Sequence, residues 1–207
     1  MNIGIIGTGR MGTGLAALWA ARGHTIMISS RDPARARHVA AAISHDMQGG
    51  SLAGAVAFGD VLLLAVPWTA AEALLTSLGS LEGKILIDIM NAFGPDGLPA
   101  FGHTTSLAEQ VAGWSPGARV VKAFNGIYFQ HLGSSQYGDD REAVFFCGDD
   151  AGARATVAQL IADAGFDPVD SGPLIAARLV EPMGFLWMQL AFRAGHGPDV
   201  GFKLLRR

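Results

Sequence analysis

The sequence is poor in cysteine and in long apolar runs, and each shortage excludes a class of protein. Cys147 is the only cysteine among 207 residues, so an intramolecular disulfide is impossible and we expect a reducing, cytoplasmic location. The longest apolar run, residues 61–66, is far shorter than the ~20 residues of a membrane-spanning helix. The start has no basic segment followed by an apolar core, so we expect no signal peptide.

Charged residues are also few, and no sign of charge dominates. They make up 16% of the chain, with a formal net charge of −3, so we expect no general attraction to nucleic acid or to a membrane surface. No His, Cys, Asp or Glu residues have the spacing of a metal site. Apolar residues make up 50% of the chain, and a chain of this length can bury roughly 70% of its unfolded surface.

The most informative feature present is a glycine-rich turn at the start of the chain. It joins an apolar run, residues 3–6, to a stretch of helical periodicity, residues 15–21. Gly7 permits the sharp turn, Gly9 leaves room for a pyrophosphate beside the backbone, and Gly12 lets the helix pack closely on the strand. The helix N-terminus then offers open amides to the pyrophosphate. The strand–turn–helix context predicts a dinucleotide site. Its residues are Gly7, Thr8, Gly9, Arg10, Met11 and Gly12.

The end of the second predicted strand favours NADP over NAD. An NAD site usually has an acidic residue there for the ribose hydroxyls, whereas this chain has Ser30 and Arg31. The Arg31 guanidinium suits both adenine stacking and pairing with a 2′-phosphate, and Arg35 lies one helical turn further on. Asp32 is an alternative ribose ligand, but Asp32-Pro33 is more simply a helix N-cap and a first-turn proline. Arg35 also fits an ordinary solvated helix face.

Predicted strands and helices alternate along most of the chain. We expect strands at 45–48, 61–66, 84–89, 119–124, 143–147 and 166–169, and helices at 33–43, 51–58, 69–78, 151–164 and 174–194. A further helix is expected after a cap at Thr105-Ser106. This alternation predicts a Rossmann-type α/β fold with a doubly wound, mostly parallel sheet. We assign residues 1–172 to an NAD(P)-binding Rossmann domain and residues 173–207 to a C-terminal helical extension.

Ligands of such sheets bind beyond the carboxyl ends of the strands. The segment Ala65-Val66-Pro67-Trp68 ends one strand, and long loops follow Asn91 and Asn125. Either asparagine could hydrogen-bond a nicotinamide carboxamide or a substrate carbonyl, or simply cap its loop. Phe124 could flank a planar ring or belong to the core. Lys122 is expected to pair with an acidic residue, and no residue is assigned as a catalytic acid or base.

The terminal segment is apolar almost all round its predicted helix, from Met183 to Phe192. Such a helix must be buried on every side, and a subunit interface is one way to bury it. Arg178 and Glu181, one turn apart, are expected to pair.

Several stretches together resemble the NADPH-dependent reductases of the deazaflavin coenzyme F-420 and the related cytoplasmic reductase domain of the six-transmembrane metalloreductases. The stretches are residues 7–12, Ser30-Arg31 with Arg35, Val66-Pro67-Trp68, residues 120–125, residues 147–150, Asp170-x-Gly172-Pro173-Leu174 and Arg178-Leu179-x-Glu181.

This resemblance implies NADP(H) bound at Thr8, Ser30, Arg31 and Arg35, with the nicotinamide near Val66-Pro67. It also implies a deazaflavin or FMN as co-substrate over the nicotinamide, and a homodimer through the C-terminal helix. We expect Ala65, Trp68 and Asn91 to complete the cofactor site.

The expected reaction is hydride transfer between NADPH and a flavin-like acceptor, which needs aligned rings but little acid–base chemistry. Asn91, Phe124 and Asn125 are the candidates for positioning those rings. A small imine reductase of the pyrroline-carboxylate type and a non-catalytic NADP-sensing module remain as alternatives.

Overall fold

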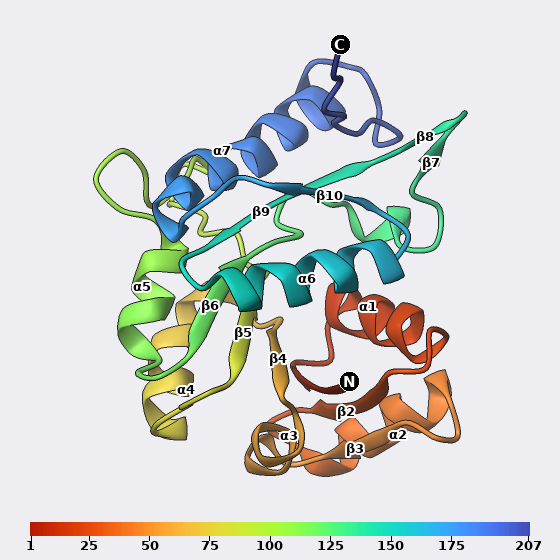
Figure 1. The fold of residues 1–207 in the computed structure, drawn as a ribbon, viewed down its shortest axis with the longest axis vertical. Helices are drawn as coiled ribbons and strands as arrows, with labels where there is room; N and C mark the ends of the chain where they lie inside the picture. Colours follow the sequence, from red (N-terminus) through yellow and green to blue (C-terminus); the bar gives the residue numbers. More distant parts are fainter.

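The computed structural model describes residues 1–207, and its centre is one eight-stranded sheet (Figure 1). The strand order is β10-β9-β6-β5-β4-β1-β2-β3. The strands are β1 (Asn2–Ile6), β2 (Thr25–Ser29), β3 (Gln48–Gly50), β4 (Val61–Leu64), β5 (Ile85–Asp88), β6 (Arg119–Lys122), β9 (Ala143–Gly148) and β10 (Asp167–Asp170). All neighbours pair in parallel except β6 and β9, which are antiparallel. The predicted Rossmann-type, mostly parallel fold is therefore confirmed.

Helices cover both faces of this sheet (Figure 1). The α-helices are α1 (Arg10–Ala20), α2 (Pro33–Ile43), α3 (Leu52–Phe58), α4 (Ala71–Leu78), α5 (Leu107–Trp114), α6 (Ala151–Asp163) and α7 (Ala177–Met188). Shorter helical turns are η1 (Trp68–Ala70), η2 (Phe129–His131), η3 (Leu174–Ala176) and the π-helical η4 (Gln189–Arg193). A small hairpin joins β7 (Gln136–Tyr137) to β8 (Asp140–Arg141).

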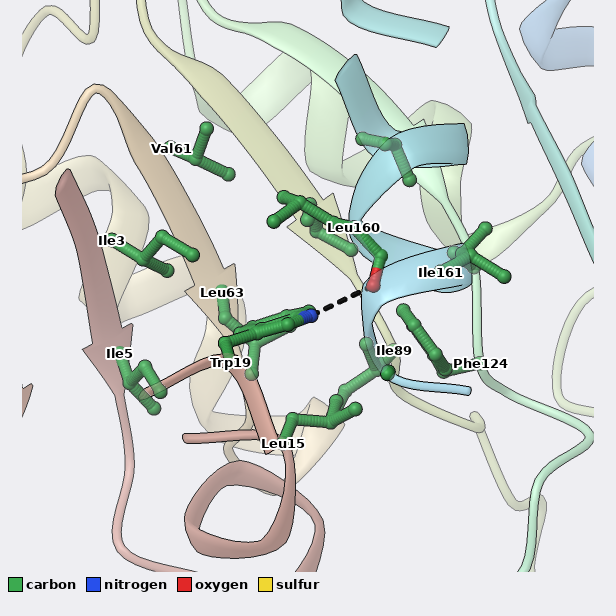
Figure 2. Packing of buried hydrophobic residues seen from close by; sticks show 14 of the residues in the cluster. Ile3, Ile5, Leu15, Trp19, Val61, Leu63, Ile89, Phe124, Leu160 and Ile161 are labelled. Carbon is green, nitrogen blue, oxygen red and sulfur yellow. Dashed lines mark hydrogen bonds between the residues drawn. The ribbon is translucent and has the colours of Figure 1, made fainter. Parts of the chain in front are cut away.

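Side-chain alternation along the strands separates two buried clusters, one on each face of the sheet. Ile3 and Ile5 of β1 pack on the face covered by α1 and α6, whereas Ile6 packs with residues of α4, α5 and α7. Figure 2 shows the first cluster, where the Trp19 indole Nε1 donates to the Leu160 carbonyl oxygen at 2.8 Å. That bond satisfies a fully buried indole and ties α1 to α6 across the sheet face.

Local capping chemistry agrees with the sequence at two helix starts. The Asp32 carboxylate caps α2 by accepting from the Ala34 amide at 2.9 Å, with Pro33 in the first turn. The Ser106 hydroxyl caps α5 by accepting from the Glu109 amide at 3.2 Å. Both caps fix where a helix begins and so where the preceding loop must end.

The structure differs from the sequence-based expectations at several places, and the expected strands 61–66 and 119–124 end earlier, at Leu64 and Lys122. Strand β3 begins at Gln48 rather than at His45. The C-terminal helix is not continuous over 174–194, because a 3₁₀ turn precedes α7 and a π-helical turn follows it. Arg178 pairs with Glu109, with Nη2 and Oε1 2.6 Å apart, and not with Glu181.

No helix of the protein is long and apolar enough to cross a membrane.

Candidate functional site

A groove of about 910 Å³ opens at the carboxyl ends of β1, β2 and β4. Three segments form its walls: the turn after β1, the end of β2 with the start of α2, and the residues from the end of β4 into α4. The predicted site residues among its lining are Gly7, Thr8, Gly9, Ser30, Arg31, Arg35, Ala65, Val66 and Pro67. The chain thus brings together most of the residues that the sequence singled out.

The glycine turn leaves the N-terminus of α1 open toward the groove. Gly7 has a φ of 121°, and a Cβ there would collide with the carbonyl oxygen of Ala65. Gly9 is the N-cap of α1, no side chain caps the helix, and no atom lies within 4 Å of a Cβ built on Gly9. A Cβ on Gly12 would lie 3.2 Å from the Ala65 Cβ, so the helix start packs tightly on β4. Open amides beside free space fit an anionic pyrophosphate.

The tip of β2 carries the positive charge of the groove. Arg31 and Arg35 are both exposed, and neither forms a salt bridge. The Ser30 hydroxyl donates to the Asp32 carbonyl oxygen at 2.6 Å and accepts from the Asp32 amide at 3.1 Å. The single hydroxyl proton of Ser30 is therefore already in a hydrogen bond, and the hydroxyl must rotate before it can donate to a phosphate. Two unpaired guanidiniums at one lip of the groove fit a phosphate ester.

Five predicted cofactor residues lie outside the groove lining. The Arg10 guanidinium lies 4.6 Å from the ring centre of Phe129, toward the loop after β6. Met11 packs against the core cluster under α1. Trp68 begins η1 and meets Phe101 edge-on, with ring centres 5.8 Å apart. The other two are Gly12, packed on β4, and Asn91.

Asn91 and Asn125 form a chain of hydrogen bonds that links the ends of β5 and β6 to helix α7. Asn91 Nδ2 donates to the Asn125 carbonyl oxygen at 2.7 Å, and Asn125 Nδ2 donates to the Val180 carbonyl oxygen at 3.0 Å. A Cβ on Gly184 would lie 2.6 Å from the Asn125 oxygen, so a glycine is needed for α7 to approach this closely. The Asn91 Oδ1 atom is buried and has no hydrogen-bond partner.

Phe124 lies in the core. Its side chain is 1% exposed and packs edge-on against Trp19 and Phe166, with ring centres 6.2 Å and 6.1 Å away. Its backbone has a φ of 57°, which is uncommon for a bulky residue. The Phe124 ring is therefore part of the core at the end of the sheet. The strained backbone of Phe124 turns the chain from β6 toward Asn125.

Three charged side chains form a buried cluster next to these asparagines. We call this cluster the buried triad, and its residues are Asp88, Lys122 and Glu181. The Lys122 ammonium lies 3.0 Å from Asp88 Oδ2 and 3.3 Å from Glu181 Oε1, and it donates to the Met90 carbonyl oxygen at 2.6 Å. Asp88 Oδ1 accepts from the Met90 amide at 2.8 Å. The expected pairing of Lys122 with an acid is confirmed, and it fixes the peptide just before Asn91.

Three further side chains, those of Glu181, His24 and Cys147, have structural roles. Glu181 accepts from the amides of Leu107 and Ala108, both at 2.9 Å, so it closes the N-terminus of α5. His24 Nε2 lies 2.9 Å from Asp163 Oδ2, at the opposite end of the sheet from the groove. Burial raises the pKa of the Cys147 thiol to about 12, as expected for a packed and unreactive cysteine.

One wall of the groove was not predicted from the sequence, and it comes from α3, η1 and α4. Its residues are Leu52, Thr69, Ala70, Ala73, Leu74 and Ser77. The helix after β4 flanks the crevice in a doubly wound sheet, so the topology rule gave a signal. The small residues Thr69, Ala70 and Ala73 lie where a bulky side chain would fill the groove.

Comparisons with known proteins show which family the chain belongs to. Residues 2–92 match the family described as NADP oxidoreductase, coenzyme F420-dependent. A candidate F420-dependent NADP reductase of Arthrobacter sp. FB24 has a crystal structure that superposes with a TM-score of 0.87, at 30% identity over 100% of both chains. The F420-dependent NADP reductase of Methanothermobacter thermautotrophicus is 29% identical over 93% of this chain and 90% of its own length.

The metalloreductase STEAP3 of Rattus norvegicus is 32% identical over 87% of this chain. This match covers 36% of that protein, so the chain spans about a third of the length of the metalloreductases that it matches. The chain belongs to the family of coenzyme F420-dependent NADP oxidoreductases. Members of this family are described as NADP oxidoreductases.

Proposed function

We propose that the protein transfers a hydride between NADPH and the ring of a deazaflavin of the coenzyme F420 type. The observation that carries the proposal is the groove with two unpaired arginines at its lip, in a chain that covers the whole of an F420-dependent reductase relative. When bound, NADPH supplies the hydride itself, so the protein's task is to hold two rings in register.

Each wall of the groove then has a role in holding the cofactor. The open amides at Gly9 and the start of α1 bind the pyrophosphate, and Gly7 and Thr8 shape the turn. Arg31 and Arg35, with Ser30 after rotation of its hydroxyl, bind the 2′-phosphate. Ala65, Val66 and Pro67 then flank the nicotinamide end of the groove.

The acceptor ring belongs beyond that end, over the loop after β5 and the second half of α7. Phe93 is 44% exposed, and its ring centre lies 5.0 Å from that of Phe185. Exposed aromatic rings at the carboxyl end of a sheet suit a flat, conjugated ring. Asn91 and Asn125 hold the backbone beneath this surface, so they position the rings indirectly and do not take part in the chemical step.

We also propose that the protein is a homodimer through the C-terminal extension, residues 173–207. The apolar side chains of Ile175, Leu179 and Leu186 are 55%, 75% and 50% exposed on one face of η3 and α7. Their spacing of four and seven residues aligns them on the helix surface. A second copy of this face would bury all three. The single buried thiol also fits the cytoplasm as the compartment of this enzyme.

The experiment that tests the acceptor assignment is a panel of initial rates with NADPH. Coenzyme F420, FMN, FAD and a cyclic imine are offered in turn at equal concentration. We expect the deazaflavin to be reduced fastest. Rapid reduction of the imine with inert flavins would make the protein an imine reductase, and tight NADPH binding without any turnover would make it a sensor.

A further inference from the structure

The buried triad carries more negative than positive charge. It holds two carboxylates, from Asp88 and Glu181, against one ammonium, from Lys122. The side chains of Asp88 and Lys122 are 0% exposed and that of Glu181 is 7% exposed. Charges buried in this way are weakly screened by salt, so their field extends through the protein.

The triad also lies at the end of the sheet where the groove opens. Asp88 pairs with Leu64 of β4 on one side and with Lys122 of β6 on the other. Leu64 is followed directly by Ala65 and Val66, which line the groove. Strand spacing and rise put the Asp88 Cα about 6 Å from the Ala65 Cα, so the Asp88 side of the triad lies next to the β4–β5 end of the groove.

The two forms of the cofactor differ in charge at this end. Loss of a hydride from the nicotinamide C4, taken up by the acceptor ring, gives the nicotinamide ring one positive charge. A buried negative charge below it stabilises the oxidised form relative to the reduced form. Glu181, the second carboxylate, also accepts from the Leu107 and Ala108 amides at the start of α5, and Asp88 and Glu181 both lie beside the single Lys122 ammonium.

We propose that the buried triad of Asp88, Lys122 and Glu181 lowers the reduction potential of the bound nicotinamide and so makes NADPH a stronger hydride donor. This rests on the proposed function, which puts the nicotinamide at the Ala65–Pro67 end of the groove. The protein then binds NADP⁺ more tightly, relative to NADPH, than the same fold without the surplus charge.

The test compares the dissociation constants of NADP⁺ and NADPH for two variants of opposite charge, measured by titration calorimetry. Glu181→Gln removes the surplus negative charge, and Lys122→Gln increases it. One charge at about 10 Å in an effective dielectric of ~20 corresponds to a change on the order of tenfold. We expect the NADP⁺/NADPH affinity ratio to fall on the order of tenfold in Glu181→Gln and to rise in Lys122→Gln.

A structural disturbance alone would weaken both nucleotides together, so the opposite directions separate the two explanations. Asp163→Asn is the matched control, because it neutralises a carboxylate at the far end of the sheet beside His24, and its ratio should not change. If Lys122→Gln does not fold, Asp88→Asn must move the ratio in the same direction as Glu181→Gln. An unchanged ratio in well-folded variants that bind both nucleotides overturns this inference alone, whereas wild-type protein that binds neither nucleotide overturns the proposed function.

Discussion

The choice of NADPH over NADH should depend on Arg31. Replacing it with alanine removes a guanidinium that is exposed at the groove lip and forms no ion pair within the protein. Hydrogen bonds to a charged group contribute ~1.5–3 kcal/mol, and ~1.4 kcal/mol corresponds to tenfold in affinity. Arg31→Ala should therefore weaken NADPH binding about ten- to hundredfold.

The loss should be confined to the nucleotide that carries a 2′-phosphate. NADH has a hydroxyl there, so its dissociation constant should change little. Because Arg31 is exposed, salt should shrink the difference between wild type and variant. Arg37→Ala is the matched control: Arg37 lies on the neighbouring helix α2, is also exposed, and is not among the residues that line the groove. Fluorescence titration of both nucleotides at two salt concentrations measures all of these quantities. Equal losses for NADPH and NADH would refute the assignment of Arg31 to the phosphate.

Three further predictions concern stability and assembly. Lys122→Met should destabilise the fold by ~3–5 kcal/mol, because breaking a buried ion pair leaves carboxylates uncompensated; a denaturant titration that gives less than ~1 kcal/mol would contradict this. Leu179→Asp with Leu186→Asp should convert the dimer to a folded monomer in sedimentation, since both side chains are exposed on α7; unchanged sedimentation would exclude this face as the interface. Burial raises the pKa of Glu142 to about 7, so the folded state retains a proton that the unfolded state loses near pH 4.5. The contribution of Glu142 to stability should therefore decline as the pH rises from about 4.5 to about 7, and thermal unfolding of Glu142→Gln should lack this decline.

Local signals were enough to predict the fold and many of the residues that line the groove. The glycine turn depends on backbone sterics within a few residues. A Cβ on Gly7, for example, would collide with the carbonyl oxygen of Ala65. The caps at Asp32 and Ser106 are equally local. Alternating apolar strands and amphipathic helices then leave few topologies open.

The parts that depend on distant contacts could not be predicted in the same way. The side chain of Glu181 bonds amides of α5 that lie 73 and 74 residues earlier in the chain, so spacing along α7 favoured the wrong partner for Arg178. Trp187 is mostly buried in its own subunit, with its indole Nε1 donating to the Val200 carbonyl oxygen at 2.6 Å. Periodicity could not distinguish this buried side of α7 from the exposed side that carries Leu179.

Isotope tracing shows whether the hydride passes directly from NADPH to a deazaflavin. NADPH that carries deuterium on one face of the nicotinamide C4 is mixed with coenzyme F420 and the protein in a single turnover. The two faces are tested separately, and mass spectrometry follows the label. We expect the deuterium of one face to appear on the reduced deazaflavin, and the deuterium of the other face to remain in NADP⁺. An unlabelled deazaflavin from both substrates, or no reduction at all beside rapid reduction of a cyclic imine, would contradict this expectation.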